Sequence, residues 1–176
     1  MQYELTIAGL GTARELLASG TDFSHIISFS DPERDPPPGL QAPGRQVLRL
    51  VFEDLDQDEV LSALSKPPTR EHTRSIIEFG REISAGSKVL VHCHAGVSRS
   101  TATGLILLYL QLGDERLARA RLLELKPKAV PNKLLLRFAD EMLSSKLTAE
   151  MSDVYESFGR EMQERYRGML EHDQAD

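Results

Sequence analysis

The sequence predicts an α/β domain in which a mostly parallel central sheet carries helices on both faces, followed by an extra C-terminal helix. Short apolar runs typical of strands alternate with helical segments of ten or more residues, which is the pattern of a covered parallel sheet. The chain has 176 residues, 40% of them hydrophobic and 27% charged, as expected for one globular domain. We expect residues 1–147 to form this domain and residues 148–176 to form a C-terminal helix and tail packed on it.

The first third of the chain predicts three strands and one helix. Runs rich in β-branched and aromatic residues place the strands at 3–8, 25–29 and 46–52. Thr12 and Glu15 have the spacing of a capping box, which predicts a helix start there, and Gly20 predicts the end of that helix. Residues 31–44 contain five prolines and two glycines, so we expect a loop.

The rest of the chain predicts one more strand and a series of helices. The strand is expected at residues 88–92, and helices are expected after Thr69, at 100–113, at 114–126 and after Asn132. Near the C-terminus, apolar residues recur at steps of three and four, at positions 151, 155, 158, 162, 166 and 169. This stripe predicts an amphipathic helix that packs on the parent domain, with a homodimer through the same helix as the alternative.

Composition and charge exclude several classes of function. The chain carries 21 Lys and Arg against 27 Asp and Glu, a net charge of −6, which argues against a broad surface for nucleic acid or anionic lipid. The longest stretch without charge, residues 100–113, is shorter than the ~20 apolar residues of a membrane span. The N-terminus lacks the pattern of a secretory signal and the chain has one cysteine, so we expect a cytoplasmic protein.

The segment between the fourth strand and the next helix carries the clearest chemical signal. Ligands of parallel sheets bind beyond the carboxyl ends of the strands, where this segment lies. Five residues separate Cys93 from Arg99, and such a loop can curl around a tetrahedral dianion with its backbone N–H groups pointing inward. The helix start adds a positive end, and Arg99 offers a planar fork for two phosphate oxygens. The residues expected to bind phosphate are His94, Ala95, Gly96, Val97, Ser98 and Arg99.

The same surroundings make Cys93 a candidate nucleophile. A helix N-terminus and a neighbouring arginine lower the pKa of a cysteine from ~8.5 to between ~3.5 and ~7.5, which gives a thiolate at neutral pH. Ser100 is placed to donate a hydrogen bond to the sulfur. The alternative, a buried cysteine that only packs, does not account for the surrounding sequence. A metal site at His92, Cys93 and His94 is disfavoured because neighbouring strand residues point to opposite faces. We therefore expect no metal or cofactor, and His92 is expected to orient the loop.

The segment from His92 to Ser100 resembles the His-Cys-x5-Arg-Ser/Thr signature of the cysteine-based protein tyrosine phosphatase superfamily, most of all its compact dual-specificity branch. Residues 126–132 are similar to the proline-asparagine stretch found downstream of the signature in that branch. The resemblance extends over residues 24–143. It implies a two-step reaction in which Cys93 attacks phosphorus to form a cysteinyl-phosphate and water then hydrolyses it, while an upstream aspartate acts as general acid and then as base.

By its place directly after a strand, Asp54 is the expected general acid, with Asp56 and Asp58 as alternatives. The choice stays open because the interval to Cys93 is longer than in compact members of the family, through an insertion at residues 62–74. The resemblance implies a phosphomonoester hydrolase, a protein tyrosine or dual-specificity phosphatase acting on a phosphorylated protein. Two alternatives remain: a phosphatase of phosphoinositides or other small phosphate esters, and a pseudophosphatase that binds phosphate without turnover.

Overall fold

The computed structural model describes residues 2–56 and 65–173, with side chains up to residue 164 in the last helix. Within these residues the strands β1 (Glu4–Ala8), β2 (His25–Ser30), β3 (Gln46–Val51) and β4 (Lys88–His92) form one sheet. They lie in the order β1-β4-β2-β3, and all three neighbouring pairs are parallel. The expected α/β fold class with a parallel sheet is confirmed.

The register of the sheet brings the carboxyl ends of the strands to one edge. His92, the last residue of β4, is paired with Ala8 at the end of β1 and with Ser28 near the end of β2. β4 lies between these two strands, and the residues of β2 and most of those of β4 are buried because helices cover both faces. The chain therefore leaves β4 toward Cys93 from the middle of the sheet.

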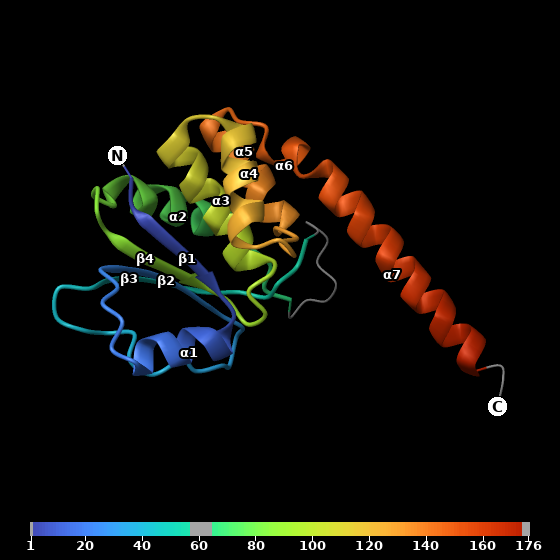
Figure 1. The fold of residues 1–176 in the computed structure, drawn as a ribbon, viewed down its shortest axis with the longest axis horizontal. Coiled ribbons are helices and arrows are strands. Elements are labelled where there is room, and N and C mark those ends of the chain that lie inside the picture. Colours follow the sequence, from blue (N-terminus) through green and yellow to red (C-terminus); the bar gives the residue numbers. More distant parts are fainter. Residues whose placement is uncertain (1, 57–64, 174–176) are drawn as a thin grey trace.

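Helices cover both faces of the sheet (Figure 1). One face is covered by α1 (Leu10–Ala18), over a small apolar cluster that includes Phe23 and Leu90. On the side of the other face lie α2 (Arg70–Glu82), α3 (Arg99–Leu112), α4 (Glu115–Leu125), α5 (Lys133–Leu143) and the short α6 (Leu147–Glu150). The larger core lies here, and α3 is its centre because its residues 99–108 are all buried.

Three of the expected helix starts have the side-chain caps that the sequence indicated. Thr69, Asp114 and Asn132 each accept a hydrogen bond from the backbone N–H three residues later. The capping box predicted at Thr12 and Glu15 is wrong, because α1 already begins at Leu10 and both residues lie inside the helix. The N–H of Leu10 instead donates to the carbonyl of His94, 3.0 Å away, so a distant loop takes the place of a side-chain cap.

The C-terminal segment begins against the domain and then leaves it. Leu147 and Met151 are fully buried, and the hydroxyl of Tyr155 in α7 (Ser152–Asp173) donates to the carbonyl of Pro131 at 3.0 Å. Further along α7, Phe158 and Met162 are 43% and 48% exposed, and the helix extends away from the body of the molecule (Figure 1). The side chains of residues 166 and 169 lie outside the described residues. A homodimer through α7 stays a prediction.

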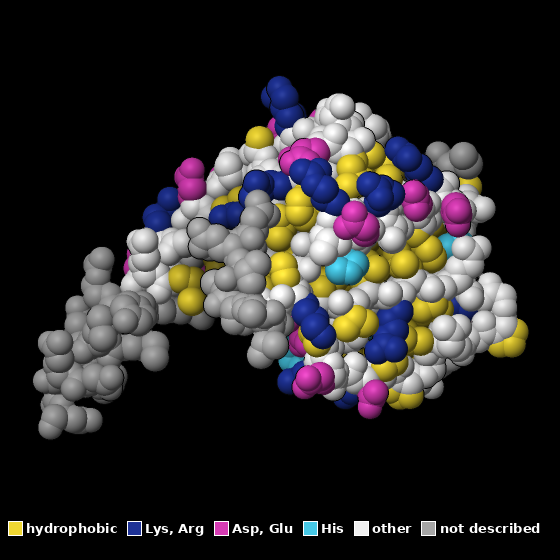
Figure 2. Space-filling view, turned by 180° about the vertical axis from the view of Figure 1, so that it is seen from behind, with side chains coloured by type: hydrophobic (Ala, Val, Ile, Leu, Met, Phe, Trp, Pro, Cys, Tyr) yellow, Lys and Arg dark blue, Asp and Glu magenta, His cyan; other side chains and the backbone are white. Residues whose placement is uncertain are grey.

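The surface carries charges of both signs. On the face in Figure 2, lysines and arginines are interspersed with aspartates and glutamates and do not form one broad basic patch. No helix in the described part of the chain is both long and apolar enough to span a membrane.

Candidate active site

The loop between β4 and α3 surrounds the sulfur of Cys93. Cys93 is buried directly after β4, and the backbone N–H of Gly96 donates to its Sγ at 3.2 Å. The Oγ of Ser100, in the first turn of α3, also lies 3.2 Å from the sulfur. The structure thus brings together the cysteine, the loop and the serine that the sequence singled out. The sulfur therefore contacts hydrogen-bonding groups from both the loop and α3.

A close backbone contact fixes the shape of this loop. Gly96 has a φ of +74°, and a Cβ at this position would lie 2.4 Å from the backbone N of Gly9 and 2.7 Å from the carbonyl carbon of Ala8. The N–H of Cys93 donates to the carbonyl of Ala8, and that of Leu10 donates to the carbonyl of His94. The turn between β1 and α1 therefore packs against the backbone of this loop and holds it in place. Sequence reasoning missed this role of Gly9 because the contact joins segments far apart in the chain.

Arg99 is the first residue of α3, and its side chain is only 3% exposed. Its Nη1 donates to Oδ1 of Asp31 and to the carbonyl of Phe52, each at 2.7 Å. Its Nε lies 3.6 Å from Oδ2 of Asp54 and has no hydrogen-bond partner within the described residues. Asp31 directly follows β2 and Phe52 directly follows β3, so the ends of two strands meet at this guanidinium. Asp31 was expected only as part of a loop.

Asp54 is held over the same loop by two donors. Its Oδ1 accepts from the Oγ of Ser98 at 2.6 Å and from the Nδ2 of Asn132 at 3.0 Å. Asn132 is fully buried, and its Nδ2 also donates to the carbonyl of Leu55 while its Oδ1 caps α5. The proline-asparagine stretch that the sequence indicated therefore fixes the segment that carries Asp54. This contact brings the expected general acid to the loop between β4 and α3.

Asp56 has a different environment. Its Oδ1 accepts from the backbone N–H of Lys133, the first residue of α5, at 2.9 Å. Burial raises the pKa of Asp56, and the hydrogen bond from Lys133 partly opposes this rise. Asp56 thus ties its segment to α5. Asp58, the third candidate, lies outside the described residues.

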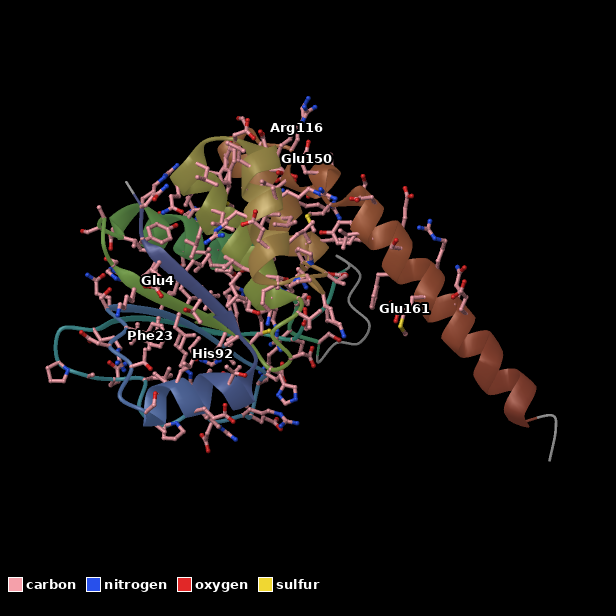
Figure 3. The ribbon with its side chains drawn as sticks, in the orientation of Figure 1. Glu4, Phe23, His92, Arg116, Glu150 and Glu161 are labelled. Atoms are coloured by element: carbon pink, nitrogen blue, oxygen red, sulfur yellow. The ribbon has the colours of Figure 1, made fainter. Side chains whose placement is uncertain are left out.

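His92 lies inside the molecule, between the sheet and α1 (Figure 3). It shares this side of β4 with Leu90, since alternate residues of a strand face the same way. Burial lowers the pKa of His92 to about 4, so the ring is neutral at pH 7. The backbone of Cys93 partly opposes this fall in the pKa. The role of His92 in orienting the loop stays a prediction.

A pocket of about 190 Å³ opens beside the loop, between α1 and the segment that follows β2. Phe29 and Pro37 contribute apolar surface to it, and Arg14, Arg34 and His94 contribute basic groups. His94 and Ala95 are the exposed residues of the loop between β4 and α3, whereas Val97 and Ser98 are half-buried. Among the residues that the structure describes, no group of three or more His, Cys, Asp or Glu side chains could hold a metal ion.

Comparisons with known proteins concern the fold of the chain. No protein-family model and no curated protein sequence matches the chain. Among solved structures, the human tyrosine phosphatase-like serine/threonine/tyrosine-interacting protein is similar at 23% identity and a TM-score of 0.57, over 80% of this chain and 91% of that one. The chain has the fold of the tyrosine and dual-specificity phosphatases. DUSP15 is similar at 23% identity and a TM-score of 0.56, over 85% and 90% of the two chains. A variant of human DUSP28 is similar at 26% identity and a TM-score of 0.54, over 80% and 91%.

This phosphatase fold confirms the resemblance inferred from the signature segment at the level of the fold. Each of the three structures is covered over 90% of its length or more, so the similarity extends over a whole domain and is not confined to the loop.

Replacing Gly96 by alanine is expected to destabilise the protein. The new Cβ would contact the backbone of Gly9 and Ala8, which cannot move without displacing β1, and the positive φ adds strain. We expect the free energy of unfolding in urea to fall by about 1–3 kcal/mol. Gly11→Ala is the matched control, because a Cβ there has no neighbour within 4 Å, and it should leave stability unchanged or raise it. Equal losses in both variants would contradict this account of the loop.

The buried His92 predicts a pH dependence of stability. Its pKa is about 4 in the folded state, against ~6.5 when unfolded. Between pH ~6.5 and pH ~4 the His92 side chain binds a proton in the unfolded chain but not in the folded protein. The free energy of unfolding is therefore not reduced by His92 above pH ~6.5, and it falls as the pH is lowered from ~6.5 toward ~4. The shift corresponds to a loss of about 3 kcal/mol.

Urea unfolding between pH 4 and pH 7 tests this prediction by comparison with His92→Asn and His94→Gln. The first variant should have a flatter dependence than the unmodified protein, and the second, at the exposed loop position, should retain the original slope. Identical slopes for all three proteins would show that His92 does not titrate in this way.

Proposed function

We propose that the protein hydrolyses phosphomonoesters through a cysteinyl-phosphate intermediate and acts as a protein tyrosine or dual-specificity phosphatase. One observation carries this proposal: the buried sulfur of Cys93 lies in a loop that ends at Arg99, whose Nε is buried and has no hydrogen-bond partner within the described residues. A bound phosphate would supply the missing acceptor, because its oxygens suit both a guanidinium and the N–H groups of the loop.

In the first step the thiolate of Cys93 attacks phosphorus and the bond to the leaving oxygen breaks. The leaving oxygen takes the bonding electron pair and receives a proton from Asp54, so no alkoxide or phenoxide is released. Arg99 and the N–H groups of the loop stabilise the charge on the three remaining oxygens in the transition state. The helix N-terminus at Arg99 adds its positive end to the same oxygens.

In the second step water attacks the cysteinyl-phosphate. Asp54 accepts a proton from this water, the sulfur–phosphorus bond breaks, and the sulfur leaves as a thiolate. Ser100 supports this departure because its hydroxyl, 3.2 Å from the sulfur, donates to the developing negative charge. The enzyme returns to its initial state and inorganic phosphate is released.

The contacts of the two aspartates support Asp54 as the general acid. A raised pKa would by itself suit Asp56 to proton donation, but Oδ1 of Asp56 is bound to the backbone of Lys133. Asp54 contacts Ser98 within the loop and lies beside Arg99, where the leaving group of a bound phosphoester would be. Geometry therefore outweighs the pKa in this choice.

The surroundings of the loop favour a phosphoprotein as substrate. The pocket beside the loop can receive the group that carries the phosphate, and its apolar and charged lining suits a phosphorylated side chain with its neighbours. Within residues 94–98 the only basic side chain is His94. In the pocket, Arg14 and Arg34 are balanced by Asp31 and Asp35, so the site has no excess of basic side chains for a highly charged phosphoinositide headgroup. The joint presence of Cys93, Arg99 and Ser100 argues against a pseudophosphatase.

Hydrolysis of p-nitrophenyl phosphate between pH 5 and 8 tests the proposed activity. The unmodified protein should turn over, Cys93→Ser should lose turnover while still binding phosphate, and Arg99→Lys should lose turnover and bind phosphate more weakly because lysine lacks the planar fork. Vanadate binding without hydrolysis at any pH would favour the pseudophosphatase instead. In a second assay, a higher kcat/KM for a short-chain phosphoinositide than for phosphotyrosine and phosphothreonine peptides would favour the lipid alternative.

The choice of acid is tested by the dependence of rate on the leaving group. Asp54→Ala should lower kcat for alkyl and unsubstituted phenyl phosphates by about 100- to 10,000-fold, because these leaving groups need a proton. The loss should be smaller for p-nitrophenyl phosphate, whose leaving group departs without one. Asp56→Ala serves as the control with the same change in charge and should retain the normal dependence. The opposite pattern would transfer the role to Asp56.

A further inference from the structure

The guanidinium of Arg99 has two edges, and the protein occupies one of them. Nη1 donates to Oδ1 of Asp31 and to the carbonyl of Phe52, each at 2.7 Å. Nε and Nη2 form the other fork of the planar group, and Nε is buried without a hydrogen-bond partner within the described residues. A bidentate phosphate contact needs this second fork. The bonds at Nη1 therefore leave Nε, in the fork that the ligand requires, without a hydrogen bond, although the Asp54 carboxylate lies 3.6 Å from it.

Asp31 is fixed by its place in the sheet. It directly follows β2, which pairs with β4, so its backbone lies at the carboxyl edge next to the catalytic loop. Its side chain is 32% exposed, and its Oδ2 lies 3.9 Å from the Nε of Arg34. The carboxylate thus reaches the buried guanidinium from the side of the pocket that Asp31 helps to line.

Charge explains why an acidic residue is needed at this position. A guanidinium that is only 3% exposed is costly to bury unless an anion lies beside it. Two carboxylates approach Arg99 within the described residues, those of Asp31 and Asp54. A general acid must carry a proton at the moment of reaction, so Asp54 has no charge to offer then. Asp31 takes no part in the proposed proton transfers, so its contact with Nη1 does not depend on them.

We propose that Asp31 is a positioning residue: its carboxylate holds Nη1 of Arg99 so that the Nε and Nη2 fork faces the phosphate. The inference rests on the proposed function, since it concerns the same phosphate site. Phe52 contributes the second acceptor through its backbone, which no side-chain replacement removes. Of the two acceptors at Nη1, the Asp31 carboxylate is therefore the one that a mutation can remove.

The test compares Asp31→Asn and Asp31→Glu with Glu33→Gln, a change of the same charge in the same loop at a residue outside the site. Asp31→Asn should lower kcat/KM for p-nitrophenyl phosphate by about 10- to 100-fold, because a misplaced binding group costs this much. It should weaken vanadate inhibition by a similar factor. Asp31→Glu should recover part of both losses, and Glu33→Gln should equal the unmodified protein. Thermal unfolding of each variant shows whether the fold is retained.

A double-mutant cycle separates positioning from a general structural effect. If Asp31 acts through Arg99, Asp31→Asn should have little further effect on phosphate binding once Arg99 is replaced by Ala. Binding is measured by calorimetry in the Cys93→Ser background, which needs no turnover. Additive losses in this cycle would overturn the proposal. An increase in kcat/KM for Asp31→Asn would also overturn the proposal. Such an increase would show that the contact with Asp31 hinders the binding of substrate by Arg99.

The same measurements distinguish this inference from the proposed function. If the unmodified protein binds vanadate but hydrolyses nothing, the proposed activity fails, and weaker phosphate binding by Asp31→Asn still supports positioning. If the unmodified protein hydrolyses phosphoesters and the Asp31→Asn variant has the same kcat/KM and the same vanadate inhibition, the positioning role of Asp31 is wrong and the proposed activity stands. A protein that neither binds nor hydrolyses would overturn both.

Discussion

The buried guanidinium of Arg99 is the interaction on which the site depends. It begins α3, contacts the ends of β2 and β3 through Asp31 and Phe52, and lies beside Asp54. A buried cation needs acceptors and a counter-charge, and these come from strands that meet only when the parallel sheet has formed. The site is therefore a product of the sheet edge, and it requires the whole α/β domain.

The polar groups around Arg99 have different structural roles. Gly96 and Ser100 surround the sulfur, Asn132 and Ser98 hold Asp54, and the turn after β1 supports the backbone of the loop. Most of these contacts use backbone atoms or short side chains from rigid elements. Such groups lose little entropy on binding a ligand, which suits the loop to the oxyanion that the proposed function requires.

Some parts of the site were predictable because their determinants are local in sequence. The loop, the cysteine and the arginine lie within seven residues, and the helix caps at Thr69, Asp114 and Asn132 are set by residues three positions apart. The capping box at Thr12 was wrong because it competes with a contact from His94 that no local pattern records. Asp31 and Gly9 were missed for the same reason, since their partners lie far along the chain.

By itself the sequence determined the strand-loop-helix order, the α/β fold class and which residues the segment from Cys93 to Ser100 brings together, because periodicity and spacing act over short distances. Only the tertiary structure decided which of the acidic residues after β3 contacts the loop, which carboxylate accompanies Arg99, and how the C-terminal helix leaves the domain. These outcomes depend on where separate strands end in space. Strand register and helix packing set those positions, and neither is encoded in any single segment.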